Sequence, residues 1–148
     1  KFDKYTDTLL YLAARNEHII NKIKPALLKK KIVICDRFTN STLAYQVNGK
    51  KVDINFINNI HKKILSGVKP NIVFILKVSK RISRNRLKKR KTKNRYDNFA
   101  QSFYTKAQRS FIKLAKNRKN YFVLNSSENN NNLEKKIFHI VKNYLNIK

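Results

Sequence analysis

An acidic and a basic residue stand side by side where a short apolar run ends, and this pair could do chemistry. The run is Ile32–Cys35, and Asp36 and Arg37 follow it directly. In open α/β sheets, ligands bind beyond the carboxyl ends of the strands. A carboxylate there can hold Mg²⁺, directly or through water, and an arginine can bind a phosphate through two hydrogen bonds. Taken alone, the pair is equally compatible with a local ion pair or a turn.

The elements that must position this pair are helices and strands in alternation. Three short apolar runs predict buried strands, at Ile32–Cys35, Ile72–Leu76 and Tyr121–Leu124. Between them, apolar residues recur at helical spacing. The predicted helices cover residues 4–23, a short turn from Pro25, 40–47, 53–66, 80–89, 98–117 and 133–146. This order predicts an α/β fold with a mostly parallel sheet.

A few residues mark the ends of these elements. Asp3 or Thr6 could cap the first helix, and Ser79 could cap the helix at 80–89. Gly67 stands where a helix C-cap glycine is expected, after residue 66. Residues 47–51 are predicted to form a loop in which Gly49 supplies the turn.

The composition narrows the function classes. The formal net charge is +27, which is typical of proteins that bind polyanions or phosphorylated small molecules. However, Lys, Asn and Ile are abundant while Gly and Pro are scarce (2 each), so an A/T-rich genome is an alternative source of the charge. Lys is also spread over nearly every predicted helix, and dedicated nucleic-acid binding is therefore not expected.

The cysteine content and the length of the apolar runs predict the cellular location of the protein. Cys35 is the only cysteine, so a disulfide framework is excluded and a cytoplasmic location is expected. No apolar run approaches 18 residues, so no membrane association is expected. The first residue is Lys and there is no Met, so we expect the N-terminus of the gene product to lie upstream.

Two longer patterns are more specific than the Asp-Arg pair. Residues 9–18 read L-L-Y-L-A-A-R-N-E-H and resemble the pattern L-L-F-x-A-x-R-x-x-H of the thymidylate kinase family. Residues 36–46 read D-R-F-T-N-S-T-L-A-Y-Q and resemble that family's bacterial motif D-R-[FY]-x-x-S-[ST]-x-A-Y-Q. Residues 67–71 resemble its G-x-x-P-D segment, and residues 95–97 its D-R-[FIY]-E element. The spacing agrees throughout, so the resemblance covers essentially the whole chain.

The resemblance implies a P-loop NTPase-like nucleoside-monophosphate kinase, with three layers and a mostly parallel sheet. It implies one domain over residues 1–148, corresponding to the C-terminal part of the family, with a basic lid at about residues 84–97. Gly49 and Gly67 are the only glycines, so the sequence holds no G-x-x-x-x-G-K-[ST] loop for donor phosphates. We therefore expect the first strand or strands and the P-loop to be missing, and this chain alone to be inactive.

The resemblance also implies roles for residues of the acceptor side. Tyr11 would stack on thymine, and Arg15, one helical turn later, would hold the base edge or the monophosphate of dTMP. Thr42 would face the base, Tyr45 would sense the missing 2′-hydroxyl, and Gln46 would belong to the same wall. A core aromatic is the alternative for Tyr11, and a solvated arginine is the alternative for Arg15.

The same resemblance implies which residues neutralise the charge of the phosphates. Arg37 would bind the acceptor phosphate, Asp36 would form part of an Mg²⁺ site, and a lid arginine would act on the ATP phosphates. Arg37, Asp36 and Arg95 are thus the candidate catalytic residues. The lid candidates, none of which stands out, are Arg84, Arg86, Arg90 and Arg95.

The implied activity is transfer of the ATP γ-phosphoryl group to dTMP with Mg²⁺, giving dTDP for dTTP synthesis, by a homodimer as is common in the family. Two alternatives remain open at this point. One is a non-catalytic basic module that binds nucleotides or RNA. The other is a related nucleoside-monophosphate kinase with another acceptor.

Overall fold

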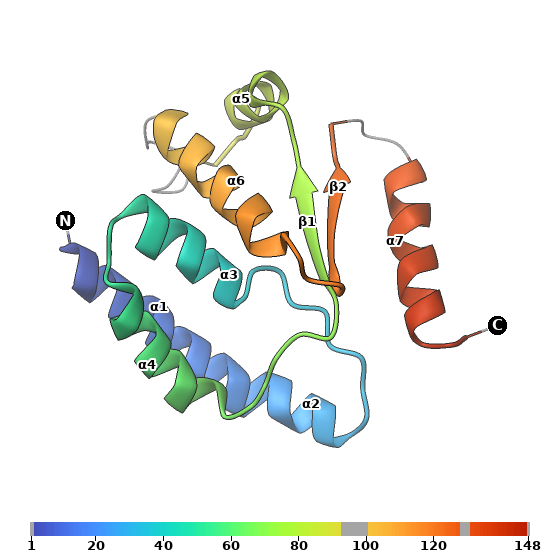
Figure 1. Cartoon of the computed structure of the whole chain (residues 1–148), viewed down its shortest axis with the longest axis horizontal. Helices are drawn as coiled ribbons and strands as arrows, with labels where there is room; N and C mark the ends of the chain where they lie inside the picture. Colours follow the sequence, from blue (N-terminus) through green and yellow to red (C-terminus); the bar gives the residue numbers. More distant parts are fainter. Residues whose placement is uncertain (1, 93–100, 128–130, 148) are drawn as a thin grey trace.

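A long helical stretch opens the chain and forms one wall of the molecule (Figure 1). In this computed structural model, which describes residues 2–92, 101–127 and 131–147, the stretch consists of α1 (Lys4–His18), η1 (Ile19–Ile23) and α2 (Lys24–Leu28). The Asp3 carboxylate caps α1 by accepting hydrogen bonds from the backbone N–H groups of Tyr5 and Thr6. η1 has the wider π-helical winding and leads into α2 without a break, so Pro25 continues the stretch near the start of α2.

A small apolar core lies between α1 and α4 (Ile54–Leu65), which run side by side in Figure 1. Leu12 of α1 packs there with Val52 and with Ile57 of α4. The Asp53 carboxylate caps α4 by accepting hydrogen bonds from Asn55 N–H and Phe56 N–H. Burial of these apolar side chains holds the two helices together.

A second helical stretch lies between the α1–α4 pair and α6 (Gln101–Ala115). It consists of α3 (Thr39–Thr42) and the π-helical η2 (Leu43–Gly49), and it packs against α6. Asn48 Nδ2 donates a hydrogen bond to the buried Ser110 Oγ of α6, at 2.9 Å. At its other end η2 is tied to α1, because Lys50 Nζ forms an ion pair with the buried Asp7.

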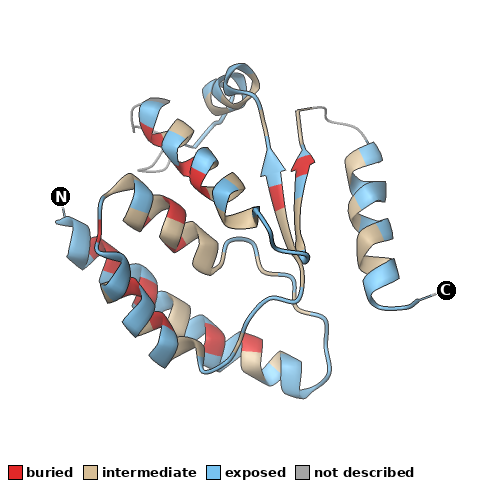
Figure 2. Ribbon diagram, viewed as in Figure 1, coloured by how far each residue is buried: buried red, intermediate tan, exposed pale blue. Residues whose placement is uncertain are grey.

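The sheet in the described residues has two parallel strands, β1 (Val73–Lys77) and β2 (Tyr121–Asn125). They pair in the register Val73 to Tyr121 through Lys77 to Asn125. α6 contacts both strands, while α5 (Lys80–Lys88) follows β1 and α7 (Asn131–Tyr144) stands beside β2 (Figure 1). Neither α5 nor α7 has a fully buried residue among those described (Figure 2).

The predicted strand at Ile32–Cys35 is wrong for the described part of the chain. Residues 31–35 have no regular secondary structure, and Ile32 and Ile34 are 69% and 94% exposed. An extended apolar run becomes a strand only where another strand offers hydrogen bonds, and no described strand pairs with this one. The other two strands and all the helices are present, with ends that shift by a few residues.

Two glycine predictions need correction. Gly49 ends η2 rather than forming a turn, and the left-handed residue of that connection is Lys51, with φ of 61°. At the end of α4 the left-handed cap is Ser66, with φ of 45°, and Gly67 follows with φ of 81°. The glycine at 49 is needed for packing instead, because a Cβ atom there would lie 2.5 Å from Cε2 of Phe103.

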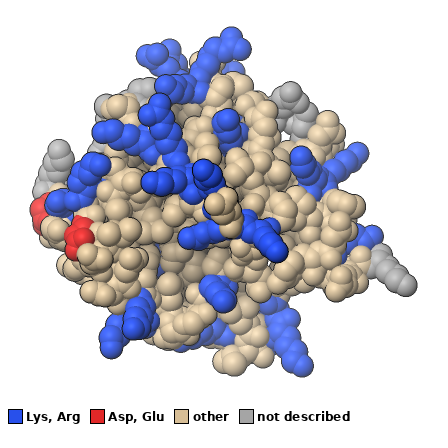
Figure 3. Space-filling view, viewed as in Figure 1, with Lys and Arg blue, Asp and Glu red and all other residues tan. Residues whose placement is uncertain are grey.

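Charge is spread over the surface rather than concentrated on one element. Figure 3 shows Lys and Arg side chains over most of one face, with acidic residues only near its left edge. Within the described ranges, no helix is long and apolar enough to cross a membrane.

Candidate functional site

Arg15 is the residue around which the predicted site is built. It lies near the end of α1, and its Nη2 donates a hydrogen bond to Oγ1 of Thr42, the last residue of α3, at 3.3 Å. Its guanidinium carbon lies 5.1 Å from the ring centroid of Phe38, a cation–π distance. Thr42 is 2% exposed, so the interaction is largely shielded from water. The structure thus brings together residues from both sequence patterns.

The charge of Arg15 is not balanced by a described carboxylate. Among described residues, the one ion pair joins Lys50 and Asp7. Burial lowers the pKa of the Arg15 guanidinium, and the nearby Cys35 opposes that effect. Burial likewise raises the pKa of the Cys35 thiol, which Arg15 partly offsets. A partly buried cation without a counter-ion favours an anionic or carbonyl-rich ligand.

Arg37 directly precedes Phe38 in the chain and has a strained backbone conformation. Its φ is 66°, in the left-handed region that non-glycine residues rarely adopt. Its guanidinium carbon lies 5.2 Å from the ring centroid of Tyr45. The Tyr45 ring packs in turn on Phe103 and Phe111 of α6, at centroid distances of 5.7 and 6.0 Å. The rings of Tyr45, Phe103 and Phe111 therefore form a packed cluster, and the Arg37 guanidinium lies against its Tyr45 ring.

The other residues predicted for the acceptor side differ from one another in their exposure to solvent. Tyr11 lies one helical turn before Arg15 on α1 and is 38% exposed, so it is not a core aromatic. Gln46 is buried, and its backbone carbonyl accepts hydrogen bonds from Lys50 N–H and Val52 N–H. Asp36 is exposed in the bend before α3.

Arg84, Arg86 and Arg90, the predicted lid arginines that the structure describes, lie on or just after α5 and have no described contact with Arg15. Arg84 and Arg86 lie exposed on α5, and Arg90 lies just beyond it. In Figure 1, α5 lies beyond the carboxyl end of β1 and away from α1. Arg86 Nη2 donates hydrogen bonds to the carbonyl oxygens of Ser126 at 2.9 Å and Ser127 at 3.4 Å. Arg95, together with residues 96 and 97, falls outside the described residues.

One residue beside Arg15 was missed by the sequence patterns. His61, on α4, is only 7% exposed, and burial together with the charge of Arg15 lowers its pKa to about 4. Among the side chains described, Arg15 Nε and His61 Nε2 are the buried nitrogen or oxygen atoms that have no hydrogen-bond partner. A signal was available, because His61 interrupts the apolar face of α4 between Ile57 and Ile64.

A metal site made of protein groups alone is absent from the described ranges, which hold no group of three or more His, Cys, Asp or Glu residues that could bind an ion. Asp36 offers one exposed carboxylate. One carboxylate suits Mg²⁺ that is held mainly by substrate phosphates and water, and does not suit a metal bound by protein ligands alone.

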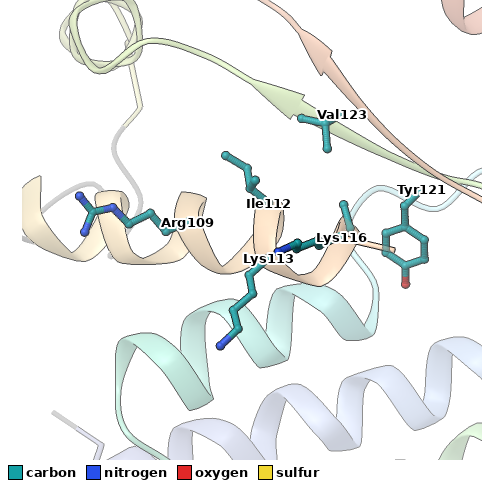
Figure 4. Close-up of a pocket in the computed structure, with 7 residues that line it drawn as sticks. Arg109, Ile112, Lys113, Lys116, Tyr121 and Val123 are labelled. Atoms are coloured by element: carbon teal, nitrogen blue, oxygen red, sulfur yellow. The ribbon is translucent and has the colours of Figure 1, made fainter. Parts of the chain in front are cut away.

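An open pocket of about 480 Å³ lies elsewhere, between α6 and β2 (Figure 4). Ile112, Val123 and Tyr121 contribute apolar surface to it, and Arg109, Lys113 and Lys116 contribute positive charge. It includes none of the residues that the sequence patterns predicted for the site.

Comparison with known proteins decides the family. The family model described as thymidylate kinase matches residues 1–137. The chain belongs to the thymidylate kinase family. It is 41% identical over 114 residues to the thymidylate kinase of Wolbachia pipientis wMel, and this match covers 76% of this chain and 56% of that protein. It is 35% identical over 144 residues to the thymidylate kinase of Wolbachia pipientis subsp. Culex pipiens (strain wPip), covering 95% and 68%.

The fold agrees with this assignment. The crystal structure of thymidylate kinase from Ehrlichia chaffeensis superposes with a TM-score of 0.72 at 28% identity, covering 95% of this chain and 67% of that one. The predicted α/β, P-loop NTPase-like class is therefore confirmed. The chain spans about half the length of several curated thymidylate kinases that it matches.

Proposed function

We propose that these residues form the acceptor-nucleotide side of a thymidylate kinase, which transfers the γ-phosphoryl group of ATP to dTMP and gives dTDP. The observation that carries the proposal is the position of Arg15. Its guanidinium is partly buried, bonded to Thr42 and stacked on Phe38, and makes no ion pair with a described carboxylate. The family match and the relatives named thymidylate kinase support it over an RNA-binding module.

The residues divide the work of holding dTMP. We assign Arg15 to the base edge, because Thr42, its partner, is the residue expected to face the base. Tyr11 is exposed enough to stack on the thymine ring, and stacking contributes roughly 1–3 kcal/mol per base. Tyr45 limits the space at the sugar, and Gln46 belongs to the same wall of the site.

Arg37 acts on the phosphate. The left-handed backbone at Arg37 and the Tyr45 ring restrict the direction of its guanidinium, and in this proposal the guanidinium binds the dTMP phosphate and stabilises charge on the transferring group. Phosphoryl transfer depends mainly on such positioning and charge stabilisation. Mg²⁺, which ATP brings when bound, would supply further charge neutralisation, and Asp36 is the residue here that would hold it. Arg84, Arg86, Arg90 and Arg95 are proposed to form a lid at about residues 84–97 within a single domain.

Calorimetric titration of the chain with dTMP tests the proposal, with dCMP and UMP as competitors of similar charge. We expect dTMP to bind selectively and Arg15→Ala to weaken it by roughly 10- to 100-fold, as for loss of a charged hydrogen-bond donor. Arg118→Ala is the control for loss of a stacked arginine, because Arg118 is exposed, lies 5.0 Å from the Tyr121 ring and donates a hydrogen bond to the Tyr121 hydroxyl. A folded chain that does not prefer dTMP would overturn the proposal. Because these 148 residues contain no P-loop sequence, we expect them to form no dTDP by themselves.

Association into a homodimer is also proposed. Leu9, Leu10 and Ile20 are large apolar residues of the α1–η1 stretch that are about half exposed. An apolar helix face of this kind is a common subunit contact. Sedimentation equilibrium should give a dimer that Leu10→Glu dissociates, whereas Leu28→Glu, at an 85% exposed position in α2, should have less effect. A monomer at all concentrations would contradict this.

A further inference from the structure

A pair of side chains joins the beginning of α3 to the sheet. Asn40, the second residue of α3, faces the hydroxyl of Tyr121, the first residue of β2. Asn40 Nδ2 lies 3.3 Å and Oδ1 3.4 Å from that hydroxyl oxygen, so the amide can either donate to it or accept from it. Arg118 Nη1 donates to the same hydroxyl at 2.9 Å, and the Arg118 guanidinium carbon lies 5.0 Å from the Tyr121 ring centroid. Asn40 therefore bonds to a side chain that is itself held in place.

α3 and the turn before it depend on such contacts. α3 has only four residues, and its N-cap residue, Phe38, makes no capping hydrogen bond with its side chain. A helix this short is not stable by itself. Residues 31–35, which lead into the turn, pair with no described strand. Arg37 has a φ of 66°, and a backbone conformation of this kind persists only where the surrounding structure enforces it.

We infer that Asn40 is a positioning residue for Arg37, because its bond to Tyr121 holds the turn from which the guanidinium reaches the phosphate of the acceptor nucleotide. The inference deepens the proposed function and rests on it for the identity of that nucleotide. Asn40 lies three residues after Arg37, so fixing Asn40 limits the motion of the turn between them. The far end of α3 has a separate support in the bond between Thr42 and Arg15. Loss of the Asn40 bond should therefore weaken the phosphate contact more than the contacts to the base.

The first measurement is NMR relaxation of the backbone amides in the full 148-residue chain. Residues 36–39 should have order parameters of about 0.85 in wild type and below about 0.6 in Asn40→Ala. Tyr121→Phe, which removes a single oxygen atom, should lower them too, and it carries the test if Asn40→Ala does not fold. Tyr144→Phe is the matched control, because the Tyr144 hydroxyl accepts a hydrogen bond from Asn71 Nδ2 at 3.2 Å. This control should leave residues 36–39 as ordered as in wild type.

Calorimetry on the same variants separates the phosphate from the base. We expect Asn40→Ala and Tyr121→Phe to weaken dTMP binding roughly 3- to 10-fold and thymidine binding less than about twofold. A general loss of stability would weaken both ligands alike. In an Arg37→Ala background, Asn40→Ala should change dTMP affinity less than about twofold, because the side chain that it positions is gone. Arg118→Ala leaves the bond between Asn40 and Tyr121 in place and should bind dTMP within about threefold of wild type.

The outcomes distinguish this inference from the proposed function. Equal order of residues 36–39 in wild type, Asn40→Ala and Tyr121→Phe would overturn the positioning role. A loss of dTMP affinity in Asn40→Ala that persists in full without the Arg37 side chain would overturn it as well. If the turn is ordered in wild type and loosened in Asn40→Ala, but the wild-type chain does not prefer dTMP, the proposed function fails and the positioning of Arg37 by Asn40 stands.

Discussion

At the scale of single residues, the site depends on hydrogen bonds made by buried side chains. Thr42 is 2% exposed and gives Arg15 its one described hydrogen bond. Removing an acceptor from a buried pair costs more than the bond is worth in water, because the donor is left without a partner. Thr42 and Arg15 should therefore affect affinity for the nucleotide more than exposed residues of the same region do.

Thr42→Val is a near-isosteric test of that bond. We expect dTMP affinity to fall roughly 5- to 10-fold, equivalent to about 1–1.4 kcal/mol, because Arg15 loses one of its supports. Calorimetry measures the affinity, and urea unfolding measures the stability. Thr8→Val is the matched control: Thr8 is equally buried on α1, but its hydroxyl donates to the Lys4 carbonyl oxygen. Equal losses of affinity in the two variants would mean that Thr42 acts only through the fold.

His61 predicts a pH dependence of stability. Its pKa is about 4 in the folded chain, against 6.5 for an unperturbed histidine. Between these values the unfolded chain binds a proton that the folded chain does not, so the free energy of unfolding falls as the pH is lowered from 6.5 towards 4. The loss between pH 6.5 and pH 5 should be roughly 1–2 kcal/mol.

Urea unfolding at several pH values checks this prediction. His61→Leu should flatten the curve in this range, while His139→Leu, which removes an exposed histidine from α7, should leave it as steep as in wild type. A wild-type curve as flat as that of His61→Leu would show that His61 is protonated normally in the folded chain.

At the scale of the elements, the helices could be predicted from apolar periodicity, and the strand at 32–35 could not. Helical hydrogen bonds are local, so the pattern in α4 or α6 is enough to predict the helix. A strand needs a neighbour, which the run Ile32–Cys35 lacks among the described strands. The π-helical winding of η1 and η2 has no signal in composition either.

The same distinction applies to the site. Arg15 and Thr42 could be predicted as members of one site because both stand in recognisable sequence patterns, and the structure adds a hydrogen bond between them at 3.3 Å. His61 belongs to no such pattern, and its proximity to Arg15 arises only when α4 packs on α1. A polar residue on an otherwise apolar helix face was the available sign, and it does not reveal which residue it faces.

Gly49 tests the contact between η2 and α6. A Cβ atom at this position would meet the buried ring of Phe103 at 2.5 Å, so Gly49→Ala should force the ring or the helix to move. We expect a loss of roughly 1–3 kcal/mol in the free energy of unfolding, as for overpacked cores. Because Phe103 also supports Tyr45, dTMP affinity should fall as well.

A double-mutant cycle isolates the cause. Phe103→Leu removes the ring edge that meets the new methyl group, so Gly49→Ala should cost much less in that background. Additive effects of the two substitutions would exclude the clash as the reason. Gly67→Ala provides a contrast, because no atom lies within 4 Å and only the positive φ of 81° opposes the substitution.

At the scale of the whole molecule, the charge of +27 raises the question of whether it or the site dominates nucleotide binding. Lys and Arg side chains are scattered over the face seen in Figure 3, and any nucleotide should be attracted to a surface of this charge. Such attraction between exposed charges is screened by salt, with a Debye length of about 10 Å at 0.1 M and about 3 Å at 1 M. Contacts to the partly buried Arg15 are screened much less.

Raising the NaCl concentration from about 0.1 M to about 0.5 M should therefore separate the two contributions. We expect the affinities for dTMP, dCMP and UMP all to fall, while the ratio of dTMP to UMP affinity is kept or rises, because the discriminating contacts lie at Arg15 and Thr42. Titrations at each salt concentration measure that ratio, and Arg15→Ala should bring it close to one at both. A preference for dTMP that disappears with salt would place the discrimination on the exposed basic surface. Tight binding of long RNA that is lost with salt and indifferent to Arg37→Ala would then favour a polyanion-binding module, since no base-specific site would be needed to explain it.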